Sequence, residues 1–457
     1  MSARPDHGQL PRATAWALSA ALLLAGLAAG CGGGSKPVVA PSAPTSNTAV
    51  GLESDGSGAC VILYHRDVEC WGLNSFGQLG DGSDKPSSVP VKVGGLTGVL
   101  SLVGESSQGG YCAVLLSGGV DCWGTNTSGA LGNGSTTLTQ ADVPVAVTGL
   151  SDATNGGTNN AFTYCMLLSS ESVRCWGDNT DGQLGDGTTV AFSNVPVGVL
   201  GVFKPVGLAS DGTSFCAQLK SGGAQCWGSN ADGALGNGST AASSGVPVAV
   251  RGLNYIQKIF SRVGGYCAVI DGGGVECWGS NADGSLGDGK PSGYSAVPVA
   301  VKGLSGVSSI DGTCALLHNG RVKCWGSGIE GDLGNGTTGQ QSDVAVPVKA
   351  LTGVVQLVGD YCALLQSGGV ECWGSNDNDG ALGNGSKVAF SDVAVPVKGI
   401  AGATSLMYDP AGGGGYCALL GTSGQVECWG DNHDGELGDG GKEPSSSVPV
   451  RVTGLGS

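Results

Sequence analysis

Cysteine is the residue type here with the most evident chemistry, because seventeen of the 457 residues are cysteines. Sixteen of them form eight pairs, whose members are ten residues apart in seven pairs and eleven apart in the last. The second cysteine of every pair begins a Cys-Trp-Gly tripeptide. The pairs are Cys60 with Cys70, Cys112 with Cys122, Cys165 with Cys175, Cys216 with Cys226, Cys267 with Cys277, Cys314 with Cys324, Cys362 with Cys372, and Cys417 with Cys428. Cytosolic proteins keep their thiols reduced, so this usage favours an oxidising compartment.

The spacing within a pair fits a β-hairpin. Between Tyr111 and Gly124, two short apolar runs flank a glycine-rich turn centred on Ser117. Antiparallel pairing about that centre places Cys112 opposite Cys122, with Cα atoms expected ~4.5–5.5 Å apart and within disulfide range. Zinc is the competing interpretation, but zinc sites use closer cysteine spacings and often His, and the chain has four histidines. We therefore predict eight structural disulfides and no metal site.

The seventeenth cysteine, Cys31, follows a largely apolar segment, Ala13–Gly30, that is preceded by two arginines. The segment is slightly shorter than the ~20 residues of a membrane span and ends in small residues, as is typical of a secretory signal peptide. Leu-Ala-Ala-Gly before Cys31 resembles a bacterial lipobox, although Ala28 stands where the motif usually has Leu. We expect Cys31 to carry the lipid; an ordinary signal peptide followed by a chance cysteine is the alternative.

This N-terminus predicts three parts of the chain. Residues 1–30 are expected to be the lipoprotein signal peptide, residues 31–47 a Gly/Ser/Pro-rich tether, and residues 48–457 the folded domain. Gly32 after the cysteine does not suggest retention in the inner membrane. The expected location is therefore the cell envelope after export, lipid-anchored in the outer membrane and facing the periplasm or the cell surface.

The folded part of the sequence repeats. The eight tryptophans that follow the paired cysteines are 47–56 residues apart. Each is followed by Leu-Gly-Asp-Gly or Leu-Gly-Asn-Gly and later by Val-Pro-Val. Glycine takes 87 positions, which disfavours helices because each interior Gly costs ~1 kcal/mol relative to Ala. With 40% hydrophobic residues, the composition predicts an all-β repeat protein rich in turns.

The repeated unit resembles the regulator of chromosome condensation repeat. The resemblance is carried by Trp123-Gly124-Thr125-Asn126 with Gly129-Ala130-Leu131-Gly132-Asn133-Gly134, and by Trp176-Gly177-Asp178-Asn179 with Gly182-Gln183-Leu184-Gly185-Asp186-Gly187. It extends over roughly residues 48–457, and in the sixth unit Gly328 replaces the Asn, so that its local turn is expected to differ. The resemblance implies a β-propeller of four-stranded blades, typically seven. Eight repeats predict eight blades, and seven blades with an extra unit are the alternative.

The other motifs indicate turns rather than catalysis. Gly-x-Leu-Gly-Asp/Asn-Gly lacks the Lys-Ser/Thr of a phosphate-binding loop and is interpreted as a tight turn that needs positive φ. Ser375–Gly380, Asp178–Gly182 and Asn432–Gly435 look like parts of calcium loops, but Ser375 and Ser386 stand where an EF-hand has Asp and Glu. Polar turns are the preferred interpretation. We expect no enzyme and no cofactor; a hydrolase or lyase is the least favoured alternative.

Charge limits the partners. A formal net charge of −16 opposes binding to nucleic acid and to anionic lipid, because both require basic patches. Contact with the membrane is expected only through the lipid anchor. The family member that gives the repeat its name acts on chromatin and the GTPase Ran, but an exported chain meets neither, so no GTPase partner is expected. Another protein, or a glycan, at the envelope or cell surface is the expected partner.

Binding is expected at rim loops, where the segments before the first cysteines and those before Val-Pro vary most. Hairpin pairing also places Tyr111 opposite Trp123, on the face away from the disulfide. The recurring aromatics either form a partner-binding ring near the channel mouth or pack on their tryptophans as core. They are Tyr111, Tyr164, Phe215, Tyr266, Tyr361 and Tyr416. The expected function is a non-catalytic recognition scaffold; the alternative is a passive structural envelope lipoprotein without a specific ligand.

Overall fold

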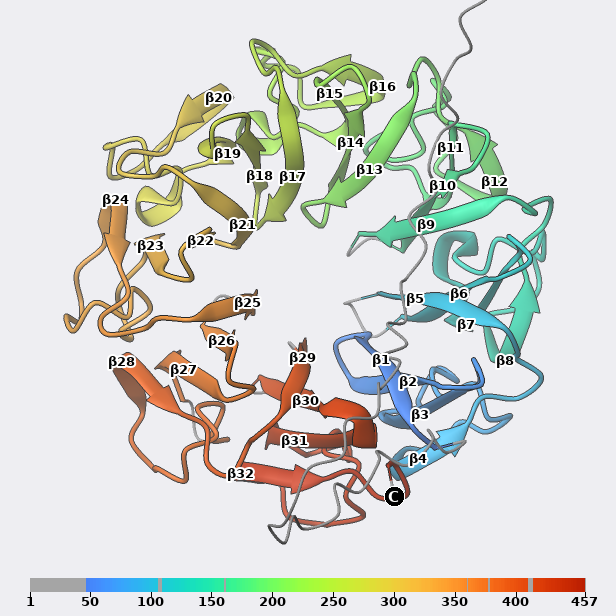
Figure 1. Ribbon diagram of the computed structural model, residues 1–457. Coiled ribbons are helices and arrows are strands. Elements are labelled where there is room, and N and C mark those ends of the chain that lie inside the picture. Colours follow the sequence, from blue (N-terminus) through green and yellow to red (C-terminus); the bar gives the residue numbers. More distant parts are fainter. Residues whose placement is uncertain are drawn as a thin grey trace, which may run out of the picture. The chain divides into compact units, whose positions relative to one another are not determined.

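The computed structural model describes residues 47–105, 109–159, 162–359, 361–376, 379–409 and 414–456. Within them the chain forms eight four-stranded antiparallel sheets, each made of four consecutive strands. Figure 1 shows these sheets as the blades of a closed ring, an eight-bladed β-propeller. The prediction of eight blades is confirmed, and the alternative of seven is wrong. The signal peptide, Cys31 and most of the tether lie outside the described residues.

The first strand of each blade lines the centre of the ring, and the second strand lies next to it (Figure 1). The first strands are β1 Ala49–Ser54, β5 Val99–Glu105, β9 Ala153–Thr158, β13 Pro205–Ser210, β17 Ile256–Arg262, β21 Val307–Asp311, β25 Val354–Val358 and β29 Ala403–Asp409. The second strands are β2 Gly58–Leu63, β6 Gly110–Leu115, β10 Thr163–Leu168, β14 Ser214–Leu219, β18 Gly265–Ile270, β22 Cys314–Leu317, β26 Cys362–Leu365 and β30 Gly415–Leu420.

The third strand begins just before each Cys-Trp-Gly, and the fourth contains Val-Pro and lies at the periphery. The third strands are β3 Val68–Gly72, β7 Val120–Thr125, β11 Val173–Asp178, β15 Ala224–Ser229, β19 Gly274–Ser280, β23 Val322–Gly326, β27 Val370–Ser375 and β31 Gln425–Asp431. The fourth strands are β4 Ser87–Lys92, β8 Gln140–Ala146, β12 Phe192–Gly198, β16 Ser243–Ala249, β20 Tyr294–Ala300, β24 Ser342–Pro347, β28 Phe390–Pro396 and β32 Ser445–Arg451. Among the described residues, four short 3-10 helices occur in turns: η1 Thr127–Gly129, η2 Ala231–Gly233, η3 Ala282–Gly284 and η4 Gly421–Ser423.

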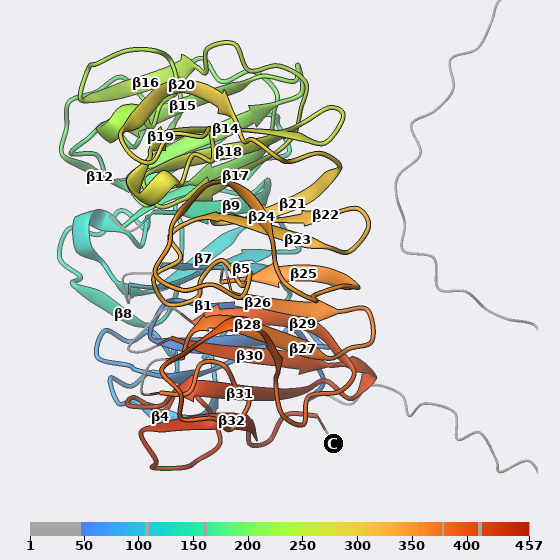
Figure 2. The same cartoon turned by 90° about the vertical axis from the view of Figure 1, so that its left-hand side faces the viewer.

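The antiparallel order gives the ring two distinct rims. The loop rim carries the turns between first and second strands and the long loops between third and fourth strands. The hairpin rim carries the turns between second and third strands and the linkers that join one blade to the next. Seen from the side in Figure 2, the sheets of neighbouring blades face one another.

The register of the central hairpin is the predicted one. Cys112 pairs with Cys122 and Tyr111 with Trp123. The turn bond from Leu115 N–H to the Gly119 carbonyl, 2.9 Å long, makes Cys112 and Cys122 a pair without mutual backbone hydrogen bonds. Such pairs lie closest together, and a disulfide joins the two residues with Cα atoms 4.0 Å apart. The observed separation is therefore somewhat shorter than the expected ~4.5–5.5 Å.

A disulfide joins the two cysteines of every pair, with Cα separations of 4.0–4.1 Å throughout. Besides Cys112 with Cys122, the bonds join Cys60 to Cys70, Cys165 to Cys175, Cys216 to Cys226, Cys267 to Cys277, Cys314 to Cys324, Cys362 to Cys372, and Cys417 to Cys428. All sixteen cysteines are buried. Each disulfide lies within one blade and closes a short hairpin. The disulfides therefore hold the strands of a blade together, whereas neighbouring blades are joined by the linkers, by packing and by hydrogen bonds.

Each interface between blades packs the disulfide of one blade against the aromatic residues of the next. The disulfide of Cys112 and Cys122, for example, shares a buried cluster with Tyr164 and Trp176. Equivalent clusters lie at all eight interfaces, including the one between the last and first blades. The hydrophobic core of this protein is therefore divided into eight similar parts arranged around the ring.

A tryptophan hydrogen bond marks every interface. The indole Nε1–H of Trp176 donates to the Ala130 carbonyl of the preceding blade over 2.8 Å. Ala130 is the variable residue of the Gly-x-Leu-Gly motif, and the same bond recurs at the other seven interfaces. Gly132 of that motif has φ +60° and lies so close to Trp176 that a Cβ would meet the ring at 2.7 Å. The glycine is required by both its conformation and the tryptophan beside it.

The Asn of Trp-Gly-x-Asn fastens the long loop. In the second blade, Asn126 Oδ1 accepts the Leu131 N–H at 3.0 Å, and Nδ2 donates to the Leu138 carbonyl at 2.9 Å. The sixth blade has Gly328 instead, and there the loop approaches so closely that a Cβ would lie 2.0 Å from the Gln340 carbonyl oxygen. The sixth unit therefore differs locally, as expected. The backbone at Gln340 lies closer to Gly328 and occupies the space that the Asn side chain takes in the other blades.

The ring is closed without exchanging a strand between the first and last blades. β1–β4 and β29–β32 form separate sheets, and Trp71 of the first blade donates to the Glu436 carbonyl of the last over 2.7 Å. Asn47 adds a 3.1 Å bond from Nδ2 to the Gly454 carbonyl. The parts of the chain that the structure describes contain no helix long and apolar enough to cross a membrane.

Candidate functional site

Most of the aromatic residues that the sequence indicated as a candidate partner-binding surface are buried. Five of the six are buried: Tyr111, Tyr164, Phe215, Tyr266 and Tyr416. Tyr164 stacks on Trp176 with ring centroids 5.8 Å apart and planes at 15°. The same contact recurs in the other four. They therefore fit the alternative of core packing, and they do not form an exposed ring.

Tyr361 is the exception among the six. It is half-buried and lines a hollow of about 360 Å³ at the mouth of the central channel. The hollow lies on the loop rim, where the first strands of blades four to eight end. Other lining residues are Asp211, Arg262, Asp311, Val263 and Tyr408. Val263 is 93% exposed at the tip of its turn.

Polar residues gather at the turns between first and second strands on the loop rim. Equivalent places in blades one to five and in blade eight are taken by Asp55, Glu105, Asn159, Asp211, Arg262 and Asp409. All of these except Asp211 are buried. Burial raises the pKa of Asp55 to about 7 and lowers that of Arg262 to about 10. The interior of this rim is therefore unusually rich in ionisable side chains for a chain with so few charges.

Arg262 is the one basic residue at these turn positions in the described chain, and it turns into its own blade. Its guanidinium donates to the carbonyls of Trp278, at 3.1 Å, and Ser280, and to Ser285 Oγ at 3.2 Å. The neighbouring Asp211 opposes the lowering of its pKa. The side chain thus serves chiefly to hold the long loop of the fifth blade against its inner turn.

The hairpin rim carries a groove that the sequence interpretation did not anticipate. It encloses about 520 Å³ beside the turn between β14 and β15 in the fourth blade. Phe203 and Asn254, from the linkers on either side, line it, and Leu219, Ala224, Val250 and Leu253 form its apolar part. Phe203 is 77% exposed and Tyr255, next to Asn254, is 73% exposed. These are the most exposed aromatic residues of the described chain.

The two linkers are held against the turn by backbone hydrogen bonds. Lys220 N–H donates to the Lys204 carbonyl over 2.9 Å, and Ile256 N–H donates to the Gly222 carbonyl over 3.0 Å. Lys204 and Tyr255 have φ of 52° and 57°, the left-handed region. Four other linkers have glycine at that position, namely Gly98, Gly306, Gly353 and Gly402. Lys204 and Tyr255 thus take, within their linkers, a left-handed position that these four other linkers give to glycine.

A signal for this groove was present in the sequence. The linkers elsewhere end in Thr-Gly, Ser-Asp, Ser-Gly or Ala-Gly, whereas these two read Phe203-Lys204 and Asn254-Tyr255. A position-by-position comparison of the linkers distinguishes them from the other repeats. The loops that vary most in sequence before the first cysteines lie instead on the loop rim, and parts of them lie outside the described residues.

Comparison with known proteins supports the repeat family. The Regulator of chromosome condensation (RCC1) repeat matches residues 68–115, which run from β3 of the first blade to β6 of the second. The E3 ubiquitin-protein ligase HERC2 of Homo sapiens is 34% identical over 141 residues, 30% of this chain and 3% of HERC2. RUG3, a mitochondrial RCC1 domain-containing protein of Arabidopsis thaliana, is 27% identical over 236 residues, 50% of this chain and 53% of RUG3. The match spans a small part of HERC2 and about half of RUG3.

Solved structures share the fold. Human WBSCR16 aligns with a TM-score of 0.57 at 21% identity, covering 73% of this chain and 94% of its own. Prp20p of Saccharomyces cerevisiae, the yeast RCC1, aligns with a TM-score of 0.55 at 19% identity, covering 85% of this chain and 86% of its own. The protein thus shares the β-propeller fold of these structures and contains a segment that matches the RCC1 repeat. Its many disulfides indicate an oxidising, extracytoplasmic environment.

Proposed function

We propose that this chain is an exported, lipid-anchored recognition scaffold that binds another protein through the groove on its hairpin rim. The observation that carries the proposal is a groove of about 520 Å³, partly apolar, with the exposed Phe203 in its wall and the exposed Tyr255 next in sequence to the lining residue Asn254. Aromatic side chains next to a preformed pocket are the usual anchors of protein interfaces. An apolar side chain of the partner would enter the groove and contact Phe203, and the exposed Tyr255 ring would add contact area beside it.

The strained backbone supports a role in binding. An L-residue in the left-handed region costs roughly 1 kcal/mol or more relative to glycine, and four equivalent linkers use glycine. The backbone conformation alone therefore does not explain why this linker has a tyrosine instead of glycine. Its side chain is also largely in solvent, so packing does not explain its presence.

The N-terminal sequence and the disulfides support the location. The lipobox-like segment before Cys31 would attach the protein to the envelope, and residues 31–47 would tether the propeller to that anchor. We propose no catalytic role, because the sixteen paired cysteines are committed to disulfides and cannot act as nucleophiles. Prp20p has been described with its binding to Gsp1p and histones; an exported chain would meet neither, so we propose an envelope protein as partner.

The test replaces the two aromatics by residues that other linkers use. The double variant Phe203→Ser with Tyr255→Gly copies Ser151 and Gly306 at equivalent positions, so the fold is expected to remain stable within about 1 kcal/mol. A photo-crosslinking residue at position 204 should capture one envelope protein from intact cells. Titration of that protein with the purified propeller should give a saturable Kd, and the double variant should weaken it at least ~30-fold.

A matched control is provided on other parts of the surface. Leu116→Ser in the second blade and Ile329→Ser in the sixth remove exposed apolar side chains of 64% and 66% exposure. Both are expected to bind the partner as the wild type does. Equal weakening by the control substitutions, or no effect of the double variant, would show that the groove is not the binding surface and would favour the passive structural alternative.

A further inference from the structure

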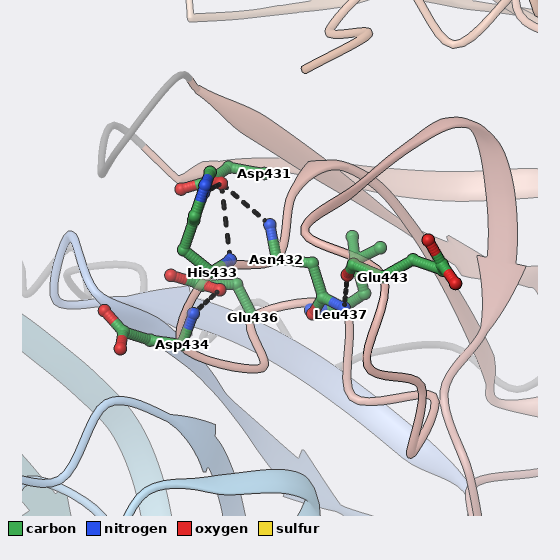
Figure 3. A network of polar contacts seen from close by, with 7 residues as sticks. All are labelled: Asp431, Asn432, His433, Asp434, Glu436, Leu437 and Glu443. Atoms are coloured by element: carbon green, nitrogen blue, oxygen red, sulfur yellow. Dashed lines mark hydrogen bonds and ion pairs between the residues drawn. The ribbon is translucent and has the colours of Figure 1, made fainter.

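The long loop of the last blade differs from its counterparts in chemistry. Asp431 at the end of β31 is 4% exposed, and His433 and Glu436 follow in the same loop. Figure 3 shows Asp431 and His433 side by side, with Glu436 beneath them. Asp431 Oδ1 accepts hydrogen bonds from the Asn432 N–H at 2.9 Å and from the His433 ring at Nδ1. The imidazole is thus held with one nitrogen facing a buried carboxylate.

A third side chain reaches this place from the neighbouring blade. The loop of the seventh blade is one residue longer than the equivalent loops that have this Asn. Its Asn376 Oδ1 accepts a hydrogen bond from the backbone N–H of Leu382, six residues later in the sequence. In the other loops with this Asn, the donating N–H lies five residues later. The longer loop contains Asp379, which is half-buried. One ligand atom each from Asp379, Asp431 and His433 lies within 4.8 Å of the other two. Two carboxylates and an imidazole therefore converge at the junction of blades seven and eight.

The third blade shows what this loop looks like without such a convergence. Its equivalents of Asp431, His433 and Glu436 are Asp178, Thr180 and Gln183. Asp178 Oδ2 accepts bonds from Thr180 Oγ1 at 2.7 Å and Gln183 Nε2 at 2.9 Å. Neutral donors of the same loop thus satisfy the carboxylate there. The last blade has replaced the amide donor by a second carboxylate and the hydroxyl donor by an imidazole.

The fifth blade shows that a positive charge is accommodated at the equivalent place. The guanidinium of Arg262 contacts the carbonyl of Ser280 and Oγ of Ser285. Ser280 and Ser285 correspond to Asp431 and Glu436, and Arg262 corresponds to Asp409. In the last blade, a small cavity is lined by Asp409, Asp431 and Glu436. The same structural corner therefore holds a cation in one blade and concentrates carboxylates in the other.

From this arrangement we propose that Asp379, Asp431 and His433 bind a divalent transition-metal ion between blades seven and eight. Oxygen and imidazole ligands at ~2.0–2.2 Å from zinc lie about 3.4 Å apart when the geometry is tetrahedral. Ligand atoms within 4.8 Å of one another need to move by about an ångström or less to share one ion. A groove lined by Asp379, Lys387 and Ser447 adjoins the site at Asp379.

The ligand set favours zinc over calcium. Calcium prefers six to eight oxygen ligands, whereas zinc accepts imidazole nitrogen together with carboxylate oxygen in a set of four. The sequence had indicated polar turns at Ser375–Gly380 and Asn432–Gly435, each considered alone. Their combination is a feature of the folded ring, because the two loops belong to different blades.

Zinc chloride is the probe for the test. The full chain without an added histidine tag is freed of metal by EDTA, dialysed, and titrated calorimetrically with zinc. We expect one zinc per chain with a Kd of about 10 µM or tighter. His433→Ala and Asp379→Asn should each weaken binding by at least ~10-fold. Both side chains are outside the core, so circular dichroism and the melting temperature of the metal-free variants should match the wild type.

Two controls decide the interpretation. His318→Ala removes an exposed histidine from another blade, and Asp178→Asn removes the carboxylate equivalent to Asp431; both should bind zinc as the wild type does. Replacement of zinc by cobalt should give an absorption spectrum typical of nitrogen and oxygen ligands. Absence of zinc binding below about 1 mM in the wild type, unchanged affinity in His433→Ala, or equally tight calcium binding that is insensitive to His433→Ala would each overturn the proposal.

Discussion

Asp55 shows at the level of one residue how strongly this fold perturbs a carboxyl group. Its side chain is 1% exposed, Oδ1 accepts the Ser57 N–H at 3.1 Å, and Oδ2 has no hydrogen-bond partner among the described residues. Burial is the largest cause that raises its pKa to about 7, and the nearby Glu105 adds to the effect. The folded chain therefore holds a proton on Asp55 at pH values where the unfolded chain has released it.

The stability of the fold should depend on pH because of this group. Between the unfolded value of 3.8 and the folded value of about 7, the folded state binds more protons, so the free energy of unfolding falls as the pH rises. Asp55→Asn keeps the acceptor at Oδ1 and removes the charge. We expect the free energy of unfolding of this variant to exceed that of the wild type by up to about 4 kcal/mol at pH 8, and to be nearly the same at pH 4. Urea denaturation at both pH values measures the difference; a gap that is equal at both would contradict the raised pKa.

The limits of sequence interpretation are clearest for single aromatic residues. Alternation along a strand established that Tyr164 and Trp176 share a face of their hairpin. It did not establish what covers that face, because the covering disulfide, between Cys112 and Cys122, belongs to the preceding blade. For Asp379 and His433 the difficulty was the same, since each loop is an ordinary polar turn until the ring brings the two together.

At the level of elements, the hairpin was the most predictable part of the molecule. The glycine turn, the cysteine spacing and the aromatic partner all specify one register, and the structure has that register. The linkers were least predictable, because they contain few residues and their unusual members are exposed. Only position-by-position comparison between repeats distinguishes Phe203 and Tyr255 from ordinary surface residues.

Removal of one disulfide should weaken its blade without changing the pairing. The double variant Cys216→Ala with Cys226→Ala removes the disulfide of the fourth blade, which joins two residues with Cα atoms 4.0 Å apart. Closing a loop of this size stabilises by at most ~3 kcal/mol, and the lost sulfur contacts add a smaller cost. We expect the free energy of unfolding to fall by about 2–4 kcal/mol.

The measurement is urea denaturation together with hydrogen exchange in the fourth blade. Under native, non-reducing conditions, alkylation followed by intact mass should find no free thiol in the propeller of the wild type or of the double variant. Free thiols in more than one hairpin of the wild type would show that the disulfides do not form as described.

The whole molecule is a ring of eight interfaces that use the same parts. The interface between the last and first blades has the same tryptophan bond as the others, from Trp71 to the Glu436 carbonyl. This interface joins the first blade to the last, so its formation closes the ring. The number of repeats in the sequence predicted the number of blades, whereas the manner of closure required the structure.

Trp71→Phe tests whether the closing interface is as strong as an internal one. The substitution removes the indole donor, leaves the Glu436 carbonyl without that bond and opens a small cavity, so it should cost about 2–3 kcal/mol. Trp227→Phe removes the equivalent bond to the Gln183 carbonyl inside the ring and serves as the control. Urea denaturation should give similar losses for both. A much smaller loss for Trp71→Phe would indicate that the ring is open in solution.

The confinement of every disulfide to a single blade has a mechanical consequence. A chain pulled from its two ends separates its blades without breaking a covalent bond, but the residues between paired cysteines cannot extend. Each disulfide bypasses ten or eleven residues, about 35 Å of contour at ~3.5 Å per residue. Under load the propeller would lengthen in steps of one blade, and each step would be about 35 Å shorter than that of a fully extended blade. A reductant would break the disulfides and add this length of about 35 Å to each step.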